Sequence, residues 1–209
     1  DTITKIDISS ITRDNVSLRD KFKFYGSDKG SNNGYWPVYT LLLEKYIDKN
    51  IRLLEIGLGT NNPKLISCMD HRYKCGGSLR AFRDYLPNAN VFGGDVDRNC
   101  LFNEERIRTC YVDQLDYETF NSLHSNFDNK KFDFIIDDGL HSITANLGTL
   151  IFAMQNINNG GTIVIEDIPV SKQPAYELFD KIIKLHYNIK KSYFISYNSN
   201  NGILYVIEK

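Results

Sequence analysis

The chain lacks several features that would mark a membrane, secreted or nucleic-acid-binding protein. Its 209 residues contain no apolar run near the ~20 residues that a transmembrane helix needs, so we expect no membrane span. The first residues do not follow the charged-then-apolar pattern of a secretory signal, and we expect a cytoplasmic location. A net charge of -1 gives no electrostatic case for a nucleic-acid partner.

Cysteine and proline are also scarce. None of the four cysteines forms a C-x-x-C pair, so a structural zinc site is not expected. Cys68, His71 and Cys75 lie close in sequence but have no fourth ligand nearby, and free thiols in a reducing cytoplasm are the simpler interpretation. With five prolines, no repeat and no Pro- or Ser-rich linker, we expect a single domain over residues 1–209. Within it, residues 1–50 would form an N-terminal helical cap or lid and residues 51–209 a cofactor-binding sheet.

From residue 51 onward, strand and helix patterns alternate. This order is typical of a largely parallel sheet with helices on both faces. We therefore expect an α/β, Rossmann-like fold with a seven-stranded, mostly parallel sheet and a C-terminal antiparallel hairpin. The expected strands are 51–56, 90–95, 107–112, 132–136 and 161–165, followed by a hairpin of 191–197 and 203–207 around a turn at 198–202. The expected helices are 14–24, 37–48, 79–86 with Ser78 as N-cap, 116–126, 142–156 and 174–185.

Acidic residues follow two of the expected strands. Asp137 and Asp138 end the strand at 132–136, and Glu166 and Asp167 end the strand at 161–165. The carboxyl ends of parallel strands are where open α/β folds bind ligands. Mg²⁺ prefers a few carboxylate oxygens and leaves room for water or substrate oxygens. The pattern therefore predicts a magnesium site at Asp138, Glu166 and Asp167, with positions left for two hydroxyl groups of a substrate.

A histidine lies three residues after Asp138. A bound Mg²⁺ lowers the pKa of a coordinated hydroxyl, and His141 could then remove the proton as a general base. The resulting alkoxide would attack a methyl group in line. Simpler interpretations stay open at this stage: Asp138 could cap the following helix, the Glu166-Asp167 pair could face solvent, and a lone histidine is often structural.

A glycine turn follows the first expected strand, in the pattern Glu55-x-Gly57-x-Gly59. Glycine lets the backbone approach a ligand closely at such a turn. A dinucleotide site needs a third glycine and a helix N-terminus directly after the turn. Asn62 stands at the position of that glycine, and the next expected helix begins only near residue 78. A nucleoside cofactor without a diphosphate, such as S-adenosylmethionine, fits this turn better.

The ends of the next two strands offer contacts for such a nucleoside. Asp95 could accept hydrogen bonds from both ribose hydroxyls, although an acid at this place could also be a helix N-cap. Asp113 and Gln114 could meet the adenine edge.

Taken together, the spaced motifs resemble a known family over about residues 22 to 170. They are similar to the class I S-adenosylmethionine-dependent methyltransferases related to macrocin O-methyltransferase, which are magnesium-dependent sugar O-methyltransferases. The resemblance is carried by Tyr25-Gly26-Ser27-Asp28-Lys29-Gly30, Glu55-Ile56-Gly57-Leu58-Gly59, Gly76-Gly77-Ser78-Leu79-Arg80, Arg83-Asp84-Tyr85-Leu86-Pro87-Asn88-Ala89, Asp113-Gln114, Asp137-Asp138-Gly139-Leu140-His141 and Ile165-Glu166-Asp167.

The resemblance implies roles for particular residues. It implies metal ligands at Asp138, Glu166 and Asp167 and a base at His141. It also implies that the loop from Tyr25 to Lys29 closes over the cofactor, and that further cofactor contacts come from Glu55, Gly57, Asp95, Asp113 and Gln114, with Asp137 nearby. The sequence departs from the family at Leu140, where a small residue is usual, and in lacking the large N-terminal region of the macrolide sugar enzymes.

These observations predict an O-methyltransferase that moves a methyl group from S-adenosylmethionine to a hydroxyl of a sugar or sugar-like metabolite. The acceptor would be a small molecule, such as a surface-polysaccharide or natural-product precursor. A phosphorus-bearing or acidic oxygen on a polysaccharide precursor is the alternative acceptor. From other classes, a dinucleotide-dependent oxidoreductase and a binding protein that keeps the fold without catalysis remain open, as does a homo-oligomer.

Overall fold

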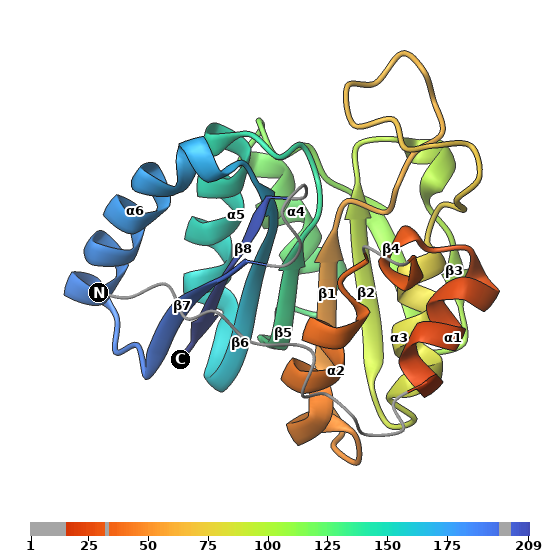
Figure 1. Cartoon of the computed structure of the whole chain (residues 1–209), viewed down its shortest axis with the longest axis horizontal. Helices are drawn as coiled ribbons and strands as arrows, with labels where there is room; N and C mark the ends of the chain where they lie inside the picture. The colour runs from red at the N-terminus through yellow and green to blue at the C-terminus, as the bar shows by residue number, and fades with distance from the viewer. Residues whose placement is uncertain (1–15, 32–33, 197–201) are drawn as a thin grey trace.

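An eight-stranded sheet forms the centre of the protein (Figure 1). The computed structural model describes residues 16–31, 34–196 and 202–209. Along the sheet the strands follow the order β3 (Asn103–Glu104), β4 (Ile107–Tyr111), β2 (Asn90–Asp95), β1 (Arg52–Ile56), β5 (Phe132–Asp137), β6 (Ile157–Ile168), β8 (Ile203–Glu208) and β7 (Lys191–Ser196). The pairs from β4 to β6 are parallel, and β8 and β7 add an antiparallel hairpin. The expected α/β fold with its terminal hairpin is confirmed.

The expected count of seven strands is wrong, because β3 adds an eighth. It pairs antiparallel with β4 through only two residues, Asn103 and Glu104, and both are exposed. A strand this short and polar has no hydrophobic pattern that a sequence could show. Four of the five residues of the turn expected at 198–202 lie outside the described part of the chain, which omits residues 197–201.

Helices cover both faces of the sheet. One face carries α1 (Val16–Tyr25), α2 (Trp36–Leu43) and α3 (Gly77–Tyr85), and the other carries α4 (Glu118–Asn126), α5 (Ile143–Asn156) and α6 (Gln173–His186). Each face has its own apolar core. Leu53 and Phe134 point to the first and Leu54 and Ile135 to the second, as the two-residue period of a strand requires.

Two helix starts test the expected caps. Asp138 was considered as a cap for the helix that follows it, but the Ser142 side chain accepts a hydrogen bond from the backbone N–H of Ala145, so Ser142 and not Asp138 caps α5. The expected Ser78 cap is wrong. The N-cap of α3 is Gly76, whose φ of +68° suits glycine, and Ser78 lies inside the helix, where its hydroxyl donates to the Glu55 carboxylate.

The N-terminal helices pack onto the sheet as part of its core. Leu18, Phe22, Tyr39 and Leu43 are fully buried in the cluster that also contains strand residues. The helix expected at 37–48 is shorter, because α2 ends at Leu43 and a 3-10 turn, Glu44–Tyr46, follows it. The expected division into a cap at 1–50 and a sheet at 51–209, and the movement of that cap as a lid, remain predictions.

Among the helices that the structure describes, none has the length and apolar character needed to cross a bilayer.

Candidate active site

The strand order changes direction between β1 and β5. From β1 the chain continues to β2 on one side, whereas β5 and β6 lie on the other. In open α/β sheets, ligands bind at the carboxyl edge of such a switch point. Gly57 lies there with a φ of +93°, and a Cβ on it would stand 2.0 Å from the Asp138 carbonyl oxygen. Glycine therefore lets the β1 turn lie directly against the acidic end of β5.

The sheet register brings acids from different strands together. Asp137 pairs with Ile165, so Asp138 and Glu166, one residue further on, follow equivalent positions of neighbouring strands. Glu55 pairs with Ile136, two residues before Asp138, and therefore shares its face. Asp137 takes the opposite face, where its carboxylate accepts hydrogen bonds from the side chains of Gln114 and Asn146, both 2.9 Å away.

One buried ammonium group contacts three of these acids. Nζ of Lys29 lies 2.6 Å from Oδ2 of Asp138, 2.8 and 2.9 Å from the two oxygens of Glu166, and 3.5 Å from Glu55. Lys29 is only 3% exposed. Sequence reasoning placed this residue over the cofactor; the structure places its charge among the carboxylates.

Two tyrosines of the N-terminal region complete the acidic site. The hydroxyl of Tyr35 donates to Asp167, and that of Tyr39, one helical turn later, donates to Glu166. Sequence reasoning considered them as part of a lid or acceptor wall but did not predict their contacts with these acids. Their spacing of four residues put both on one helix face, but aromatic residues at this spacing usually form core, so the signal was weak.

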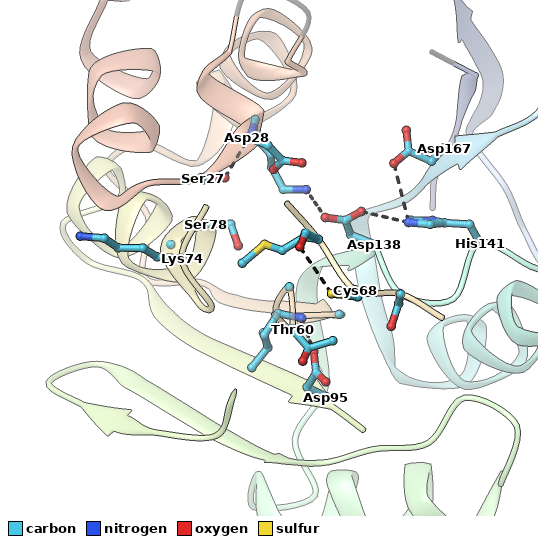
Figure 2. Close-up of a pocket in the computed structure, with 18 of the residues that line it drawn as sticks. Ser27, Asp28, Thr60, Cys68, Lys74, Ser78, Asp95, Asp138, His141 and Asp167 are labelled. Atoms are coloured by element: carbon cyan, nitrogen blue, oxygen red, sulfur yellow. Dashed lines mark hydrogen bonds and ion pairs between the residues drawn. The ribbon is translucent and has the colours of Figure 1, made fainter. Parts of the chain in front are cut away.

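His141 lies between two carboxylates at the open side of this cluster (Figure 2). Its Nε2 is 3.8 Å from Oδ1 of Asp138 and 3.7 Å from Oδ2 of Asp167. Both distances are short enough for an ion pair but too long for a hydrogen bond. The side chain of His141 is 34% exposed. Both His141 and Asp167 have left-handed backbones, with φ of +52° and +53°. Non-glycine residues adopt this conformation at a cost, and such strain tends to occur at functional sites.

The donor set suits a hard divalent cation. Asp138, His141 and Asp167 each offer a ligand atom, and these atoms lie within 4.8 Å of one another. No other group of three such residues lies this close together in the described part of the chain. Cys68, His71 and Cys75 therefore do not form a comparable group. Two carboxylates with water or substrate oxygens fit the octahedral preference of Mg²⁺. Glu166 is buried and not solvent-facing, but Lys29 and Tyr39 contact its oxygens, so its predicted place as a third ligand remains a prediction.

Burial is the main reason that the pKa values of these carboxyl groups are raised, and neighbouring carboxylates add to it. Burial raises the pKa of Glu55 to about 7 and that of Asp138 to about 6, in both cases against the lowering effect of Lys29. Burial and the nearby Asp138 also raise the pKa of Glu166. Burial opposes the charge of Lys29, but the three acids outweigh it and raise its pKa well above the ordinary value. A bound divalent cation would offset this excess of negative charge.

A pocket joins the acidic cluster to the glycine turn. Gly57, Gly59 and Asp95 line it together with Lys29, Asp138, His141 and Asp167 (Figure 2). Asp95 accepts from the backbone N–H groups of Leu58 and Asp97, each at 2.7 Å, and Asp97, not Asp95, is the N-cap of the following 3-10 turn.

An adjacent hollow shares several of these wall residues. Gly57 and Asp95 line it too, with Asp113, Gln114 and the apolar side chains of Val96, Val112 and Leu140. The Gln114 amide donates to Asp137 and Thr149 and accepts from the Leu140 N–H, so its side chain is already bonded within the protein.

Three residues expected at the cofactor lie behind or away from these walls. Tyr25 donates to Asp84 of α3 at 2.5 Å. Glu55 is fully buried, accepts a hydrogen bond from Ser78 and forms an ion pair with Lys29, and Asp137 faces α5. Their contacts with a cofactor, like the roles of the residues that do line the pocket, remain predictions.

Proteins of known activity align with most of this chain. Mycinamicin VI 2''-O-methyltransferase of Micromonospora griseorubida is 30% identical over 155 residues, which is 74% of this chain and 36% of that protein. L-olivosyl-oleandolide 3-O-methyltransferase of Streptomyces antibioticus is 33% identical over 165 residues, 78% of this chain and 39% of that protein. The chain is a relative of macrolide and sugar O-methyltransferases. It spans less than two fifths of the length of these relatives. No protein-family model matches it.

Solved structures confirm the methyltransferase fold. MycE methyltransferase from the mycinamycin biosynthetic pathway, in complex with Mg and SAH, superposes with a TM-score of 0.72 and 24% identity, covering 92% of this chain and 54% of that one. A putative ribosomal RNA methyltransferase from Plasmodium falciparum gives a TM-score of 0.56 and 18% identity, covering 82% of this chain and 94% of that one. The family resemblance and the Rossmann-like fold inferred from sequence are thereby confirmed.

Proposed function

We propose that this protein is an S-adenosylmethionine-dependent, Mg²⁺-dependent O-methyltransferase that acts on a hydroxyl of a sugar or sugar-like metabolite. One observation carries the proposal: a single pocket is lined both by the glycine turn with Asp95 and by Asp138, His141 and Asp167. The cofactor half and the acid-base half of a methyl transfer therefore face one space. The relatives named above, which are O-methyltransferases of sugar-bearing natural products, support the same reaction.

S-adenosylmethionine would supply the methyl group in this reaction. Asp138 and Asp167, with Glu166 nearby, would hold Mg²⁺, which when bound would polarise the acceptor oxygen. Nε2 of His141 takes the hydroxyl proton as the oxygen bonds to the methyl carbon and the carbon–sulfur bond breaks. Asp138 and Asp167, within 4 Å of that nitrogen, stabilise the imidazolium that results. The glycine turn and the Asp95 carboxylate hold the donor, so that much of the acceleration comes from orientation.

A transfer assay tests the proposal. The protein is incubated with methyl-labelled S-adenosylmethionine, Mg²⁺ and a panel of nucleotide sugars, glycosylated natural products and sugar phosphates. Label in an ether at a sugar carbon supports the proposal. Label on a phosphorus-bearing or carboxylic oxygen would support the alternative acceptor. Label in no member of the panel, together with no binding of S-adenosylhomocysteine, would contradict the proposal.

The alternatives from other classes are less well supported. The relatives transfer methyl groups, and the Gly57–Gly59 turn lacks the third glycine of a dinucleotide site. A thermal-shift comparison of NAD with S-adenosylhomocysteine separates the two cofactors. Stabilisation by NAD alone would favour an oxidoreductase.

We further propose that the acceptor is a small molecule and not a nucleic acid, and that the enzyme works in the cytoplasm. The net charge of -1 supports the first point, and the four free cysteines support the second. A homo-oligomer is a separate prediction, which light scattering on the purified protein measures directly.

A further inference from the structure

Lys29 lies on the buried side of Asp138, and His141 lies on the open side. The ammonium contacts Oδ2 of Asp138 at 2.6 Å, whereas Oδ1 is the oxygen that faces His141 at 3.8 Å. The two oxygens of this carboxylate are therefore in different surroundings. Oδ2 is occupied by Lys29, and Oδ1 faces His141, which with Asp138 and Asp167 forms the group of possible metal ligands at the pocket.

The same ammonium also fixes Glu166. It lies within 2.9 Å of both Glu166 oxygens, and Tyr39 donates to one of them from α2. One cation thus holds carboxylates from two neighbouring strands, because Asp138 follows β5 and Glu166 lies near the end of β6. Glu55 on β1 is 3.5 Å away and faces the same charge.

The backbone around Lys29 is itself firmly placed. Ser27 caps the 3-10 turn Asp28–Gly30, and its hydroxyl accepts from the Lys29 N–H. Gly34 packs so tightly that a Cβ on it would stand 2.2 Å from the Lys29 carbonyl oxygen. The turn therefore presents the lysine side chain in one direction before any ligand binds.

We propose that Lys29 is a positioning residue of the metal site, which orients Asp138 and Glu166 so that one oxygen of Asp138 faces the divalent cation. This rests on the proposed function, because the metal belongs to it. Partners that orient metal ligands typically change metal affinity about 10- to 100-fold when they are removed. Charge alone predicts the opposite result, because a nearby ammonium repels a divalent cation and its removal would strengthen metal binding.

The difference in sign makes the test direct. Isothermal titration measures Mn²⁺ binding to the whole wild-type chain and to Lys29→Met, without acceptor and without turnover. We expect Lys29→Met to bind Mn²⁺ at least about 10-fold more weakly. Lys74→Met is the matched control, because Lys74 lines the same pocket and its removal takes away one positive charge. Unchanged or slightly stronger Mn²⁺ binding is expected for it.

S-adenosylhomocysteine binding separates positioning from cofactor contact. Lys29→Met should retain affinity for it within about 3-fold, which also shows that the variant is folded. Equal or tighter Mn²⁺ binding by Lys29→Met would overturn the proposal, and so would a loss confined to S-adenosylhomocysteine. If Lys29→Met does not fold, Lys29→Arg keeps the charge but not the compact ammonium; weakened Mn²⁺ binding supports positioning, and wild-type binding contradicts it.

Failure of the proposed function gives a different result. A wild-type chain that binds neither Mn²⁺ nor S-adenosylhomocysteine would contradict the methyltransferase proposal and this inference together. A wild-type chain that binds both, beside a Lys29→Met variant that binds Mn²⁺ equally well, would contradict only the positioning role.

Discussion

Asp137 and Asp138 are neighbours in the chain, yet they have different surroundings. Asp138 faces Lys29 and the pocket, whereas Asp137 faces α5 and bonds to Asn146. The two-residue period of a strand forces adjacent side chains to opposite faces. A strand that is buried on both faces is apolar throughout, so its sequence does not show which side chains point to which face of the sheet. For this reason the sequence analysis placed Asp137 beside the cofactor.

The proposed base gives the first prediction. His141→Ala should reduce methyl transfer by about 10²- to 10⁴-fold, because general acid-base groups typically contribute that much. Its affinity for S-adenosylhomocysteine should stay within about 2-fold of wild type. The measurements are turnover with labelled donor and calorimetric binding. His186→Ala, an exposed histidine at the end of α6, is the control with expected wild-type activity. Full turnover in His141→Ala would contradict a role as base.

Glu55 gives a prediction about pH and stability. Burial raises its pKa to about 7 from an ordinary value of 4.5, so the folded chain holds the proton more tightly than the unfolded chain. The stability from this group is fully present below pH 4.5 and is lost as the pH rises through 7. Glu55→Gln does not titrate, so its free energy of unfolding relative to wild type should rise between pH 5 and 8, by up to about 3 kcal/mol.

Urea unfolding of both proteins at several pH values measures this difference. Glu105→Gln changes an exposed glutamate, and its difference from wild type should stay within about 0.5 kcal/mol at every pH. A gap between Glu55→Gln and wild type that is constant with pH, or that favours wild type at pH 8, would contradict the raised pKa.

The turn that follows β1 is the element on which the pocket depends. Gly57 and Gly59 both have positive φ, and both line the pocket. Beyond them, the loop of residues 60–76 projects past the carboxyl end of β1 before α3 begins (Figure 1). This long loop was expected from the sequence, because no helix start follows the glycines directly.

Two glycine substitutions separate a close approach from backbone strain. Gly57→Ala combines a positive φ with a Cβ 2.0 Å from the Asp138 carbonyl oxygen, whereas Gly160→Ala, with φ of +82°, meets nothing within 4 Å. We expect Gly160→Ala to lose about 1–3 kcal/mol of stability from strain alone and to bind S-adenosylhomocysteine normally. Gly57→Ala should lose more stability and bind S-adenosylhomocysteine at least about 10-fold more weakly, because the backbone at Gly57 and Asp138 must move apart. Denaturant unfolding and calorimetry measure both, and equal behaviour of the two variants would contradict the close-approach argument.

The charged groups of the candidate active site come together only when the whole chain has folded. They come from the turn at Asp28–Gly30, the strand β1, the ends of β5 and β6 and the residue His141 before α5. Glu55, Asp138 and Glu166 face one lysine, and Asp167 lies 3.7 Å from His141, so this place holds more carboxyl groups than ammonium groups. The proposed function therefore predicts that this site takes up a divalent cation from solution.

Metal removal tests that arrangement as a whole. Treatment with a chelator followed by dialysis should abolish methyl transfer, because the acceptor oxygen loses its polarising cation, and added Mg²⁺ should restore it. Binding of S-adenosylhomocysteine should persist in the chelated protein within a few-fold, since the glycine turn and Asp95 do not need the metal. Labelled-donor turnover before and after Mg²⁺ addition is the measurement. Transfer that continues after chelation would show a metal-free mechanism.

The sequence by itself determined the fold class, the terminal hairpin and the strand ends that carry acids and glycines, because strand period, helix caps and turn residues act over a few neighbouring positions. It did not determine that Lys29, Tyr35 and Tyr39 would reach the carboxylates of β5 and β6, which lie more than 100 residues away in the chain. Those contacts depend on how α1 and α2 pack against the sheet. The tertiary structure alone decided them, since the charge that a buried acid needs can come from any segment that packing brings within about 3 Å.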